Sequence, residues 1–323
     1  MFFRYTFILI FSLLIAFVFY LQIKEPNPNS EQMQNLVYTF NNHNNHQIIF
    51  IGSSRVLRQV NPLIIDSLTD LSSYCLGIDQ IGMIESKMLL MSYLAHHPKP
   101  KFVVLNIDLS TFMFNTNSSG PYNLEEYFSY TSDTLINNQL SRFNYKFKYP
   151  LIFKTIAATK PFIRKFTLSD SQKRSLFFSK NIEIQPYTES NLMKGFLATS
   201  QTWNDEAEKE YNKLNQTILE EIPITEEGFE LLTEFIQVCK TRKIECKLVF
   251  VPWYKGLKKN PNHFTVLNKV KTIAKDSDTE FYDFSDSGLG NSKDLFYDCW
   301  HFNQKGSNLY SKLLAERINK SRN

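Results

Sequence analysis

Residues 48–57, IIFIGSSRVL, decide how the rest of the chain is interpreted. The first four residues are β-branched or aromatic, as in a strand that is buried on both faces. Gly52, Ser53 and Ser54 then end the run abruptly, before Arg55. Such an ending fits a tight turn with helix-capping hydroxyls, or it places a serine nucleophile at a strand end.

Downstream, short apolar runs alternate with longer amphipathic ones, which is typical of strands joined by crossover helices in a parallel sheet. The predicted strands cover residues 47–51, 73–76, 102–107, 247–251 and 280–282. The predicted helices include residues 83–97, 203–220, 225–244 and 303–323. We therefore predict an α/β fold, with three α/β/α layers around a parallel central sheet, over residues 47–323.

Residues 112–200 interrupt this alternation. They are rich in aromatic, basic and asparagine residues and contain no clean strand pattern. Since the stretch is too long for an ordinary loop, we predict a mostly helical insertion in the domain.

The N-terminus carries the longest apolar stretch. Residues 5–23, YTFILIFSLLIAFVFYLQI, contain no charge and have the length of a membrane-spanning helix. A cleaved signal peptide is the alternative, but VFYLQIKEP offers no small-x-small cleavage site. We predict an uncleaved transmembrane signal anchor, with residues 1–4 in the cytoplasm. The small positive-inside bias of Arg4 favours an extracytoplasmic main domain.

The segment between the anchor and the first strand is polar. Residues 24–46 are rich in asparagine and contain two prolines, which predicts a tether from membrane to domain. His43 and His46 lie in it, and we interpret them as solvated linker residues rather than metal ligands.

Charge and cysteine content exclude several classes of function. The 323 residues include 36 basic and 32 acidic side chains in scattered positions, for a net charge of +4, so no nucleic-acid partner is expected. Cys75, Cys239, Cys246 and Cys299 lack zinc-ligand spacing, and we expect no metal and no cofactor. Cys239 and Cys246 fit a disulfide about as well as they fit buried thiols, and a Cys75–Cys299 bond is the less favoured pairing.

A second motif, near the C-terminus, supplies the residues that a serine nucleophile in residues 48–57 would need. In DLFYDCWHFNQKG, Asp298 and His301 are three residues apart, just before the final predicted helix. In a turn, this spacing brings the carboxylate back onto the imidazole. Ser54, His301 and Asp298 therefore supply a nucleophile, a general base and a residue that orients the base.

These two segments resemble the first and last signature blocks of the SGNH (GDSL-like) hydrolase superfamily. In that superfamily a Gly-Asp-Ser after the first strand carries the nucleophile, and a C-terminal Asp-x-x-His carries the base. The resemblance implies a flavodoxin-like fold, Ser54 as nucleophile, His301 as base and Asp298 as its orienting residue. Ser53 takes the variable middle position.

The layout is similar to the membrane-anchored envelope branch of this superfamily. That branch includes the D-alanyl transfer protein of teichoic acid modification and the alginate O-acetylation proteins. The shared features are an N-terminal anchor, Gly-Ser-Ser, a long helical insertion and an ending of the form FYD..H.N..G, here residues 296–306. The resemblance implies the membrane, an acylated glycan or glycolipid and other envelope acylation proteins as partners.

The oxyanion hole is less clearly marked. The superfamily uses the nucleophile's own N–H with a glycine and an asparagine further along, and here the candidates are Ser54, Gly77 and the Gln80 backbone. The segment LNIDLS, residues 105–110, does not match the asparagine motif, because an ionised Asp108 cannot donate a hydrogen bond.

Three further residues are candidates for substrate binding. Arg55 either neutralises an anionic group or anchors the turn by pairing with an acid, and we favour the second interpretation. Trp253 and Tyr254 follow a predicted strand, where α/β sheets place their ligands. They form either a stacking platform for sugar or ordinary loop packing.

The leading hypothesis is a membrane-anchored SGNH-like serine esterase or O-acyltransferase that acts on an envelope polysaccharide or glycolipid. The alternative from another class is an inactive SGNH-fold scaffold in an envelope acylation machinery. A secreted lipase-like enzyme is a third interpretation. Convergence of Ser54, His301 and Asp298 within hydrogen-bond reach would favour an enzyme.

Overall fold

The computed structural model describes residues 31–41, 44–112, 127, 134–143, 193–216, 224–255 and 262–322. The chain divides into two compact units. One comprises Glu31–Tyr122 and Tyr187–Asn323 and contains the candidate site, and the other comprises Met1–Ser30 and Asn123–Pro186.

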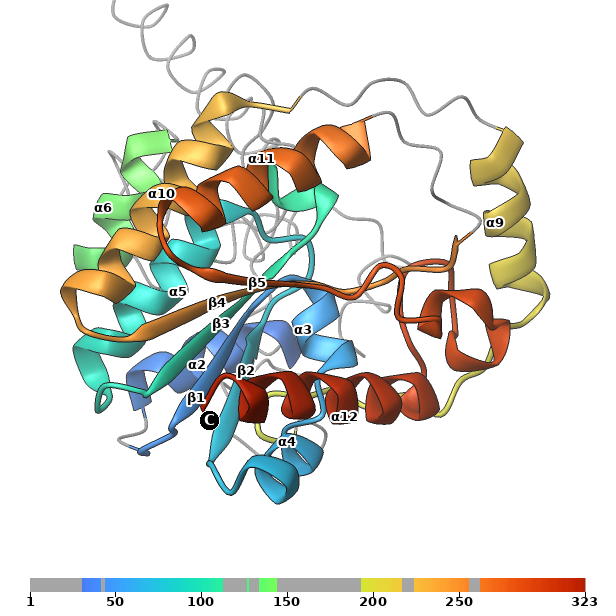
Figure 1. The fold of residues 1–323 in the computed structure, drawn as a ribbon, viewed down its shortest axis with the longest axis horizontal. Coiled ribbons are helices and arrows are strands. Elements are labelled where there is room, and N and C mark those ends of the chain that lie inside the picture. The colour runs from blue at the N-terminus through green and yellow to red at the C-terminus, as the bar shows by residue number, and fades with distance from the viewer. Residues whose placement is uncertain are drawn as a thin grey trace, which may run out of the picture. The chain divides into compact units, whose positions relative to one another are not determined.

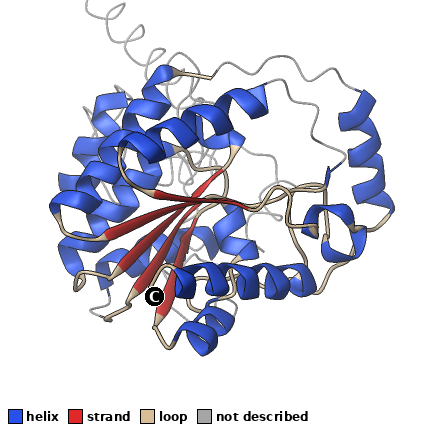
Figure 2. Cartoon of the chain, in the orientation of Figure 1, coloured by secondary structure: helices blue, strands red, loops and turns tan. Residues whose placement is uncertain are grey.

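A parallel sheet forms the centre of the unit that contains the site (Figures 1 and 2), with the strand order β2-β1-β3-β4-β5. The strands are β1 (Ile48–Gly52), β2 (Ser73–Gly77), β3 (Phe102–Ile107), β4 (Glu245–Phe250) and β5 (Glu280–Asp283). Every pairing is parallel. This is the strand order of flavodoxin-like folds. The predicted α/β class and the five predicted strands are confirmed.

Helices cover both faces of this sheet. In Figure 1, α10 (Glu226–Thr241) and α11 (Asn262–Asp276) lie on one side, and α4 (Pro62–Thr69) and α12 (Gln304–Lys320) lie on the other. α5 (Met83–His96) contacts α10, and α3 (Ser54–Gln59) contacts α12. α9 (Asp205–Gln216) is amphipathic, and the short 3₁₀ turns are Leu109–Phe112, Leu289–Asn291 and Lys293–Leu295. The result is the predicted three-layer arrangement.

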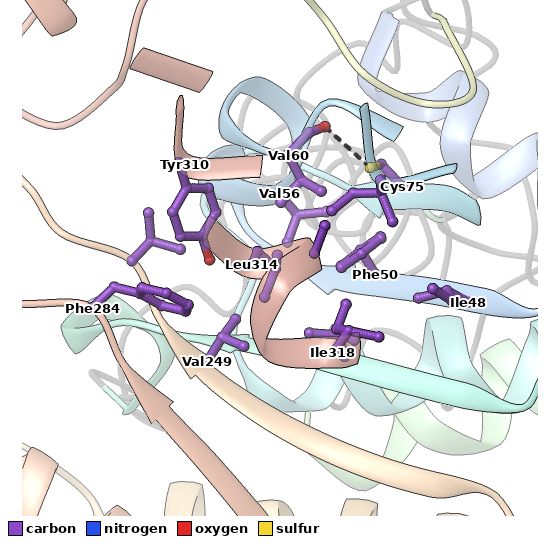
Figure 3. Close-up of a cluster of buried hydrophobic side chains, with 14 of the residues drawn as sticks. Ile48, Phe50, Val56, Val60, Cys75, Val249, Phe284, Tyr310, Leu314 and Ile318 are labelled. Atoms are coloured by element: carbon purple, nitrogen blue, oxygen red, sulfur yellow. Dashed lines mark hydrogen bonds between the residues drawn. The ribbon is translucent and has the colours of Figure 1, made fainter. Parts of the chain in front are cut away.

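One hydrophobic cluster joins the sheet to the C-terminal helix. Figure 3 shows Leu314 and Ile318 of α12 near Phe50 of β1 and Val249 of β4, and all four side chains are at most 2% exposed. Burial of each such side chain contributes about 1.5–3 kcal/mol. α12 is therefore held against the strands, and the segment that leads into it has a fixed position relative to β1.

The segment preceding β1 differs from the prediction. Part of the expected tether forms α2 (Glu31–Asn41), which contacts α5 and β2. Leu36 and Tyr38 are buried, and the Asn35 side chain donates to the Gly77 carbonyl at 2.7 Å. His46, interpreted as a solvated linker residue, is only 9% exposed and contacts the Tyr38 hydroxyl. This segment folds onto the domain because both apolar and polar side chains of α2 are buried against it.

The insertion is described only in part. In the other unit, α6 (Thr134–Phe143) is amphipathic, with Ile136 and Leu140 buried. Residues 193–200 contain no helix; there, Met193 pairs with Phe196 in a β-bridge, and the Lys194 carbonyl accepts from the Cys75 amide at 2.9 Å. The remainder of the predicted insertion lies outside the described residues.

Within the part of the chain that the structure describes, no helix has the length and apolar character needed to cross a membrane. The predicted anchor, residues 5–23, and residues 1–4 lie outside that part.

Candidate active site

Ser54 lies at the carboxyl end of β1, where the sheet order reverses between β1 and β3. β1 ends at Gly52, Ser53 is the N-cap of α3, and Ser54 is the first residue of the helix. The Ser53 hydroxyl accepts from the Arg55 amide at 3.5 Å and donates to Asp108 Oδ2 at 2.7 Å. Doubly wound sheets bind their ligands at such a switch point. Ser53 therefore caps the helix, and Ser54 lies at the strand end, where a nucleophile was predicted.

The three residues that were predicted to act together converge. Ser54 Oγ lies 2.7 Å from His301 Nε2, and His301 Nδ1 lies 2.8 Å from Asp298 Oδ2 and 3.0 Å from Oδ1. Because an ionised carboxylate only accepts, Nδ1 carries the proton, which leaves Nε2 to accept from the Ser54 hydroxyl. This is the tautomer that a general base needs.

A short turn fixes the spacing of Asp298 and His301. Asp298 Oδ1 accepts from the backbone N–H of Trp300 at 2.8 Å and of His301 at 2.7 Å. The carboxylate is thus bound to the backbone of the residue whose ring it orients. The Gln59 side chain, from the end of α3, donates to the Trp300 carbonyl at 2.8 Å and ties this turn to the helix that begins with Ser54.

The same hydrogen bonds keep Asp298 ionised. Burial raises the pKa of this carboxyl, but the hydrogen bond and charge of His301 and the two backbone N–H groups lower it, and the net pKa lies below its ordinary value. The side chains of Asp298 and His301 remain 22% and 18% exposed. His301 is therefore oriented by a charged partner and stays partly accessible.

Behind Ser54, a buried network holds the first turn of α3. Asp108 accepts from Ser53, from Thr111 N at 3.1 Å and from Thr111 Oγ1 at 3.2 Å, and it lies 3.8 Å from Arg55 Nε. Asp108 is thus an acceptor, as predicted from its charge, and supports the turn.

Arg55 has internal partners. Its Nη1 atom donates to the Val251 carbonyl at 3.0 Å, and its guanidinium lies 5.2 Å from the centre of the Trp253 ring. The side chain is 6% exposed. These contacts support the turn-anchoring interpretation over binding of a substrate charge.

The candidate oxyanion-hole residues have different environments. The first N–H groups of a helix lack intrahelical partners, so the Ser54 amide is available as a donor. Gly77 is required for packing, since a Cβ there would lie 2.3 Å from the Leu57 amide nitrogen of α3. Gln80 has φ of 59°, in the left-handed region, just beyond β2. Its unusual backbone lies at the same edge of the sheet as Ser54.

The two residues of the predicted stacking platform, Trp253 and Tyr254, have different environments. Trp253 is 4% exposed and packs against Phe250, His263 and Trp300, so it provides loop packing rather than an open surface. Tyr254 is partly exposed, and its amide donates to the Cys299 carbonyl at 3.2 Å. The Tyr254 ring lies 5.0 Å from Trp203. Lys293 Nζ lies 4.9 Å from the Trp203 ring centre and pairs with Glu208 at 2.5 Å.

Sequence reasoning missed several residues that border the site. Tyr297 stacks on His301 with 5.6 Å between ring centres and 12° between planes. Arg58 pairs with Asp79 at 3.3 Å. The helical spacing of Ser54 and Arg58, four residues apart, is a signal that could have identified Arg58.

The four cysteines are buried and free. The disulfides considered from the sequence, between Cys239 and Cys246 and between Cys75 and Cys299, are therefore not formed. The Cys75 thiol instead donates to the Val60 carbonyl at 3.4 Å (Figure 3).

No family model matches the chain, and no curated protein does. Solved structures with similarity include a proposed acylhydrolase from Bacteroides fragilis NCTC 9343, at 12% identity and a TM-score of 0.42 over 91% of this chain and 97% of that one. A proposed lipolytic protein of the G-D-S-L family from Desulfitobacterium hafniense DCB-2 has 9% identity and a TM-score of 0.42 over 84% and 99%.

The acetyl xylan esterase AlAXEase has 12% identity and a TM-score of 0.38 over 85% of this chain and 98% of that one. With TM-scores below 0.5, these similarities establish neither the family nor the function of the chain. The fold class therefore rests on the strand order, and the chemistry rests on the geometry of Ser54, His301 and Asp298.

Proposed function

We propose that the chain is an SGNH-like serine esterase or O-acyltransferase that cleaves an ester through Ser54. The observation that carries the proposal is the chain of contacts from Ser54 Oγ to His301 Nε2 and from His301 Nδ1 to Asp298. These residues come from the two ends of the domain sequence and meet at one sheet edge. A scaffold needs no such alignment, so the geometry favours the enzyme over the inactive partner.

The reaction follows from these contacts. Ser54 Oγ attacks the ester carbonyl carbon while His301 Nε2 takes the hydroxyl proton, and Asp298 stabilises the resulting imidazolium. The tetrahedral intermediate then collapses, the C–O bond to the alcohol breaks, and His301 returns the proton to the departing alcohol. The product is an acyl-Ser54 ester.

The second half of the reaction decides between hydrolysis and transfer. His301 takes a proton from water or from a sugar hydroxyl, whose oxygen attacks the acyl-Ser54 carbonyl, and Ser54 leaves with the proton from His301. The Ser54 amide at the start of α3 is our candidate oxyanion donor, and one such donor typically lowers the barrier by about 3–4 kcal/mol. The Gln80 amide is the candidate for a second.

We further propose that the substrate is an acylated envelope polysaccharide or glycolipid and that residues 5–23 anchor the enzyme in the membrane with its main domain outside. The uncharged N-terminal stretch and the resemblance to the envelope branch support this. Alkaline carbonate extraction of cells that express the full chain tests the anchor. Retention in the membrane fraction is expected, and release into the supernatant would contradict it.

Turnover of acetylated sugars by the purified full chain tests the chemistry. Loss of acetate release in Ser54→Ala, with retention in the exposed matched control Ser287→Ala, is the expected result. Equal acetate release by Ser54→Ala and wild type would refute the proposed nucleophile. Acetyl transfer to an added acceptor sugar, measured by mass spectrometry, distinguishes a transferase from an esterase.

A further inference from the structure

The accessible positive charge beside Ser54 belongs to Arg58. Arg58 is four residues after Ser54 in α3, and residues at this spacing lie on the same face of a helix, about 5–6 Å apart at Cβ. Its side chain is 23% exposed, compared with 6% for Arg55. Arg58 therefore borders the nucleophile from the solvent side, whereas Arg55 lies beneath it.

The partner of Arg58 also lies at this edge. Gly52 and Gly77 are opposite each other in the β1–β2 pairing, and Ser54 and Asp79 each follow two residues later. Arg58 Nη2 donates to Asp79 Oδ2 at 3.3 Å. Both charges act on the pKa of the Tyr297 hydroxyl. Burial and Asp298 raise this pKa, Arg58 lowers it, and Asp79 raises it. Since Tyr297 stacks on His301, the ion pair lies close to the base.

The guanidinium of Arg58 has more N–H donors than its hydrogen bond to Asp79 uses. An arginine carries five N–H donors in a planar fork. Among the described residues, Asp79 is the one hydrogen-bond acceptor of the Arg58 side chain. Asp79 thus orients the fork while the remaining donors stay available to a planar or tetrahedral anion.

We propose that Arg58, oriented by Asp79, binds an anionic group, a carboxylate or a phosphate, that the substrate carries close to its scissile ester. This inference rests on the proposed function and adds the charge of the substrate to it. Arg58 acts as a specificity residue and takes no part in the bond changes at Ser54.

The test compares esters that differ in one charge. Monomethyl succinate and dimethyl succinate form the carboxylate pair, and 1-acetylglycerol 3-phosphate and 1-acetylglycerol form the phosphate pair. The readout is the anionic-to-neutral ratio of kcat/KM, measured with the full chain. The pair with the larger wild-type ratio identifies the anion.

We expect Arg58→Gln to lower this ratio tenfold or more, through KM for the anionic ester, and Arg58→Lys to restore part of it. Arg242→Gln is the matched control, because Arg242 is exposed and lies just before β4, at the opposite edge of the sheet. It should keep the wild-type ratio. An unchanged ratio in Arg58→Gln, including one accompanied by a lower melting temperature, would overturn the proposal and leave the esterase intact.

A binding measurement separates this proposal from the proposed function. If no ester is turned over in a Ser54-dependent way, the proposed function fails. The anion site is then decided by titrating monomethyl succinate and 1-acetylglycerol 3-phosphate into full-length Ser54→Ala, with and without Arg58→Gln. At least tenfold weaker binding in the double variant supports the site, and equal binding refutes it.

Discussion

Two histidines at opposite ends of β1 make the same contact with different consequences. His301 Nε2 lies 2.7 Å from the Ser54 hydroxyl, and His46 Nε2 lies 2.7 Å from the Tyr38 hydroxyl. His301 Nδ1 faces Asp298, whereas His46 Nδ1 is buried without a hydrogen-bond partner among the described residues. Burial, followed by the charge of Lys194, lowers the pKa of His46 to about 4.

In the proposed mechanism, this difference separates a hydroxyl–imidazole pair that can act as nucleophile and base from one that cannot. An imidazolium formed at His301 would have a carboxylate in contact to stabilise it, whereas a protonated His46 would be a buried charge with no carboxylate in contact among the described residues. His46 is therefore a packing residue, which holds α2 against the sheet. Three predictions test this division between chemistry and stability.

The largest expected effect is at Asp298. Asp298→Asn should lower kcat for ester cleavage by about 10³–10⁴-fold, because an amide facing Nδ1 no longer favours the tautomer in which Nε2 is a base. Ester kinetics measure the loss, and thermal unfolding in parallel verifies that the variant is folded. A loss smaller than tenfold would mean that Asp298 does not orient the base.

The corresponding substitution beside His46 is Tyr38→Phe. It leaves His46 Nε2 buried without the hydroxyl, which should lower the free energy of unfolding by about 1–3 kcal/mol. Because His46 is remote from the ester, kcat should stay within twofold of wild type. Urea denaturation and ester kinetics provide both values. A drop in kcat that matched that of Asp298→Asn would remove the distinction between the two histidines.

The third prediction concerns the pH dependence of stability. Because the folded pKa of His46, about 4, lies below its ordinary value of 6.5, its contribution to stability is complete above about pH 6.5 and is lost as the pH falls toward 4. The contribution of Asp298 has the same sign but disappears only below its ordinary value of 3.8. Between about pH 6.5 and pH 4, the loss expected from His46 is therefore not shared with Asp298.

Denaturant unfolding of wild type and His46→Gln at several pH values measures this contribution. The difference between the two proteins isolates His46 from other titrating groups, such as Glu85, whose pKa burial raises to about 7. That difference should shrink from pH 7 to pH 4. A difference independent of pH would show that His46 titrates alike in the folded and unfolded chain.

The convergence of Ser54, His301 and Asp298 was predictable because these residues follow short-range rules. Ser54 comes directly after an apolar run, and the Asp298–His301 spacing closes a turn through backbone hydrogen bonds. Both signals are local in sequence, and the only long-range step is that the carboxyl ends of parallel strands meet at one edge of the sheet.

The docking of α2 was not predictable from hydrophobicity, because polar residues make part of the contact. Asn35 binds the Gly77 carbonyl, and the Thr39 hydroxyl lies 2.8 Å from that of Ser92. Partners 42 and 53 residues away determine whether such side chains are buried or solvated. From sequence alone, a segment rich in asparagine is therefore interpreted as a linker until its partners are known.

From the sequence, an anchoring role was favoured for Arg55, whereas Arg58 was not singled out. Both belong to α3, and only the orientation of this helix relative to the Val251 carbonyl shows that Arg55 lies inside and Arg58 outside. The packing of Trp253 depends on His263 and Trp300, which lie on other segments, in the same way.

Reaction of the full chain with a fluorophosphonate probe, followed by peptide mapping, identifies the nucleophilic serine. We expect one adduct, on Ser54, that is lost in Ser54→Ala and His301→Ala and kept in Ser287→Ala. An adduct of equal yield in Ser54→Ala, or no adduct on the wild-type chain, would contradict the assignment of Ser54 as the nucleophile.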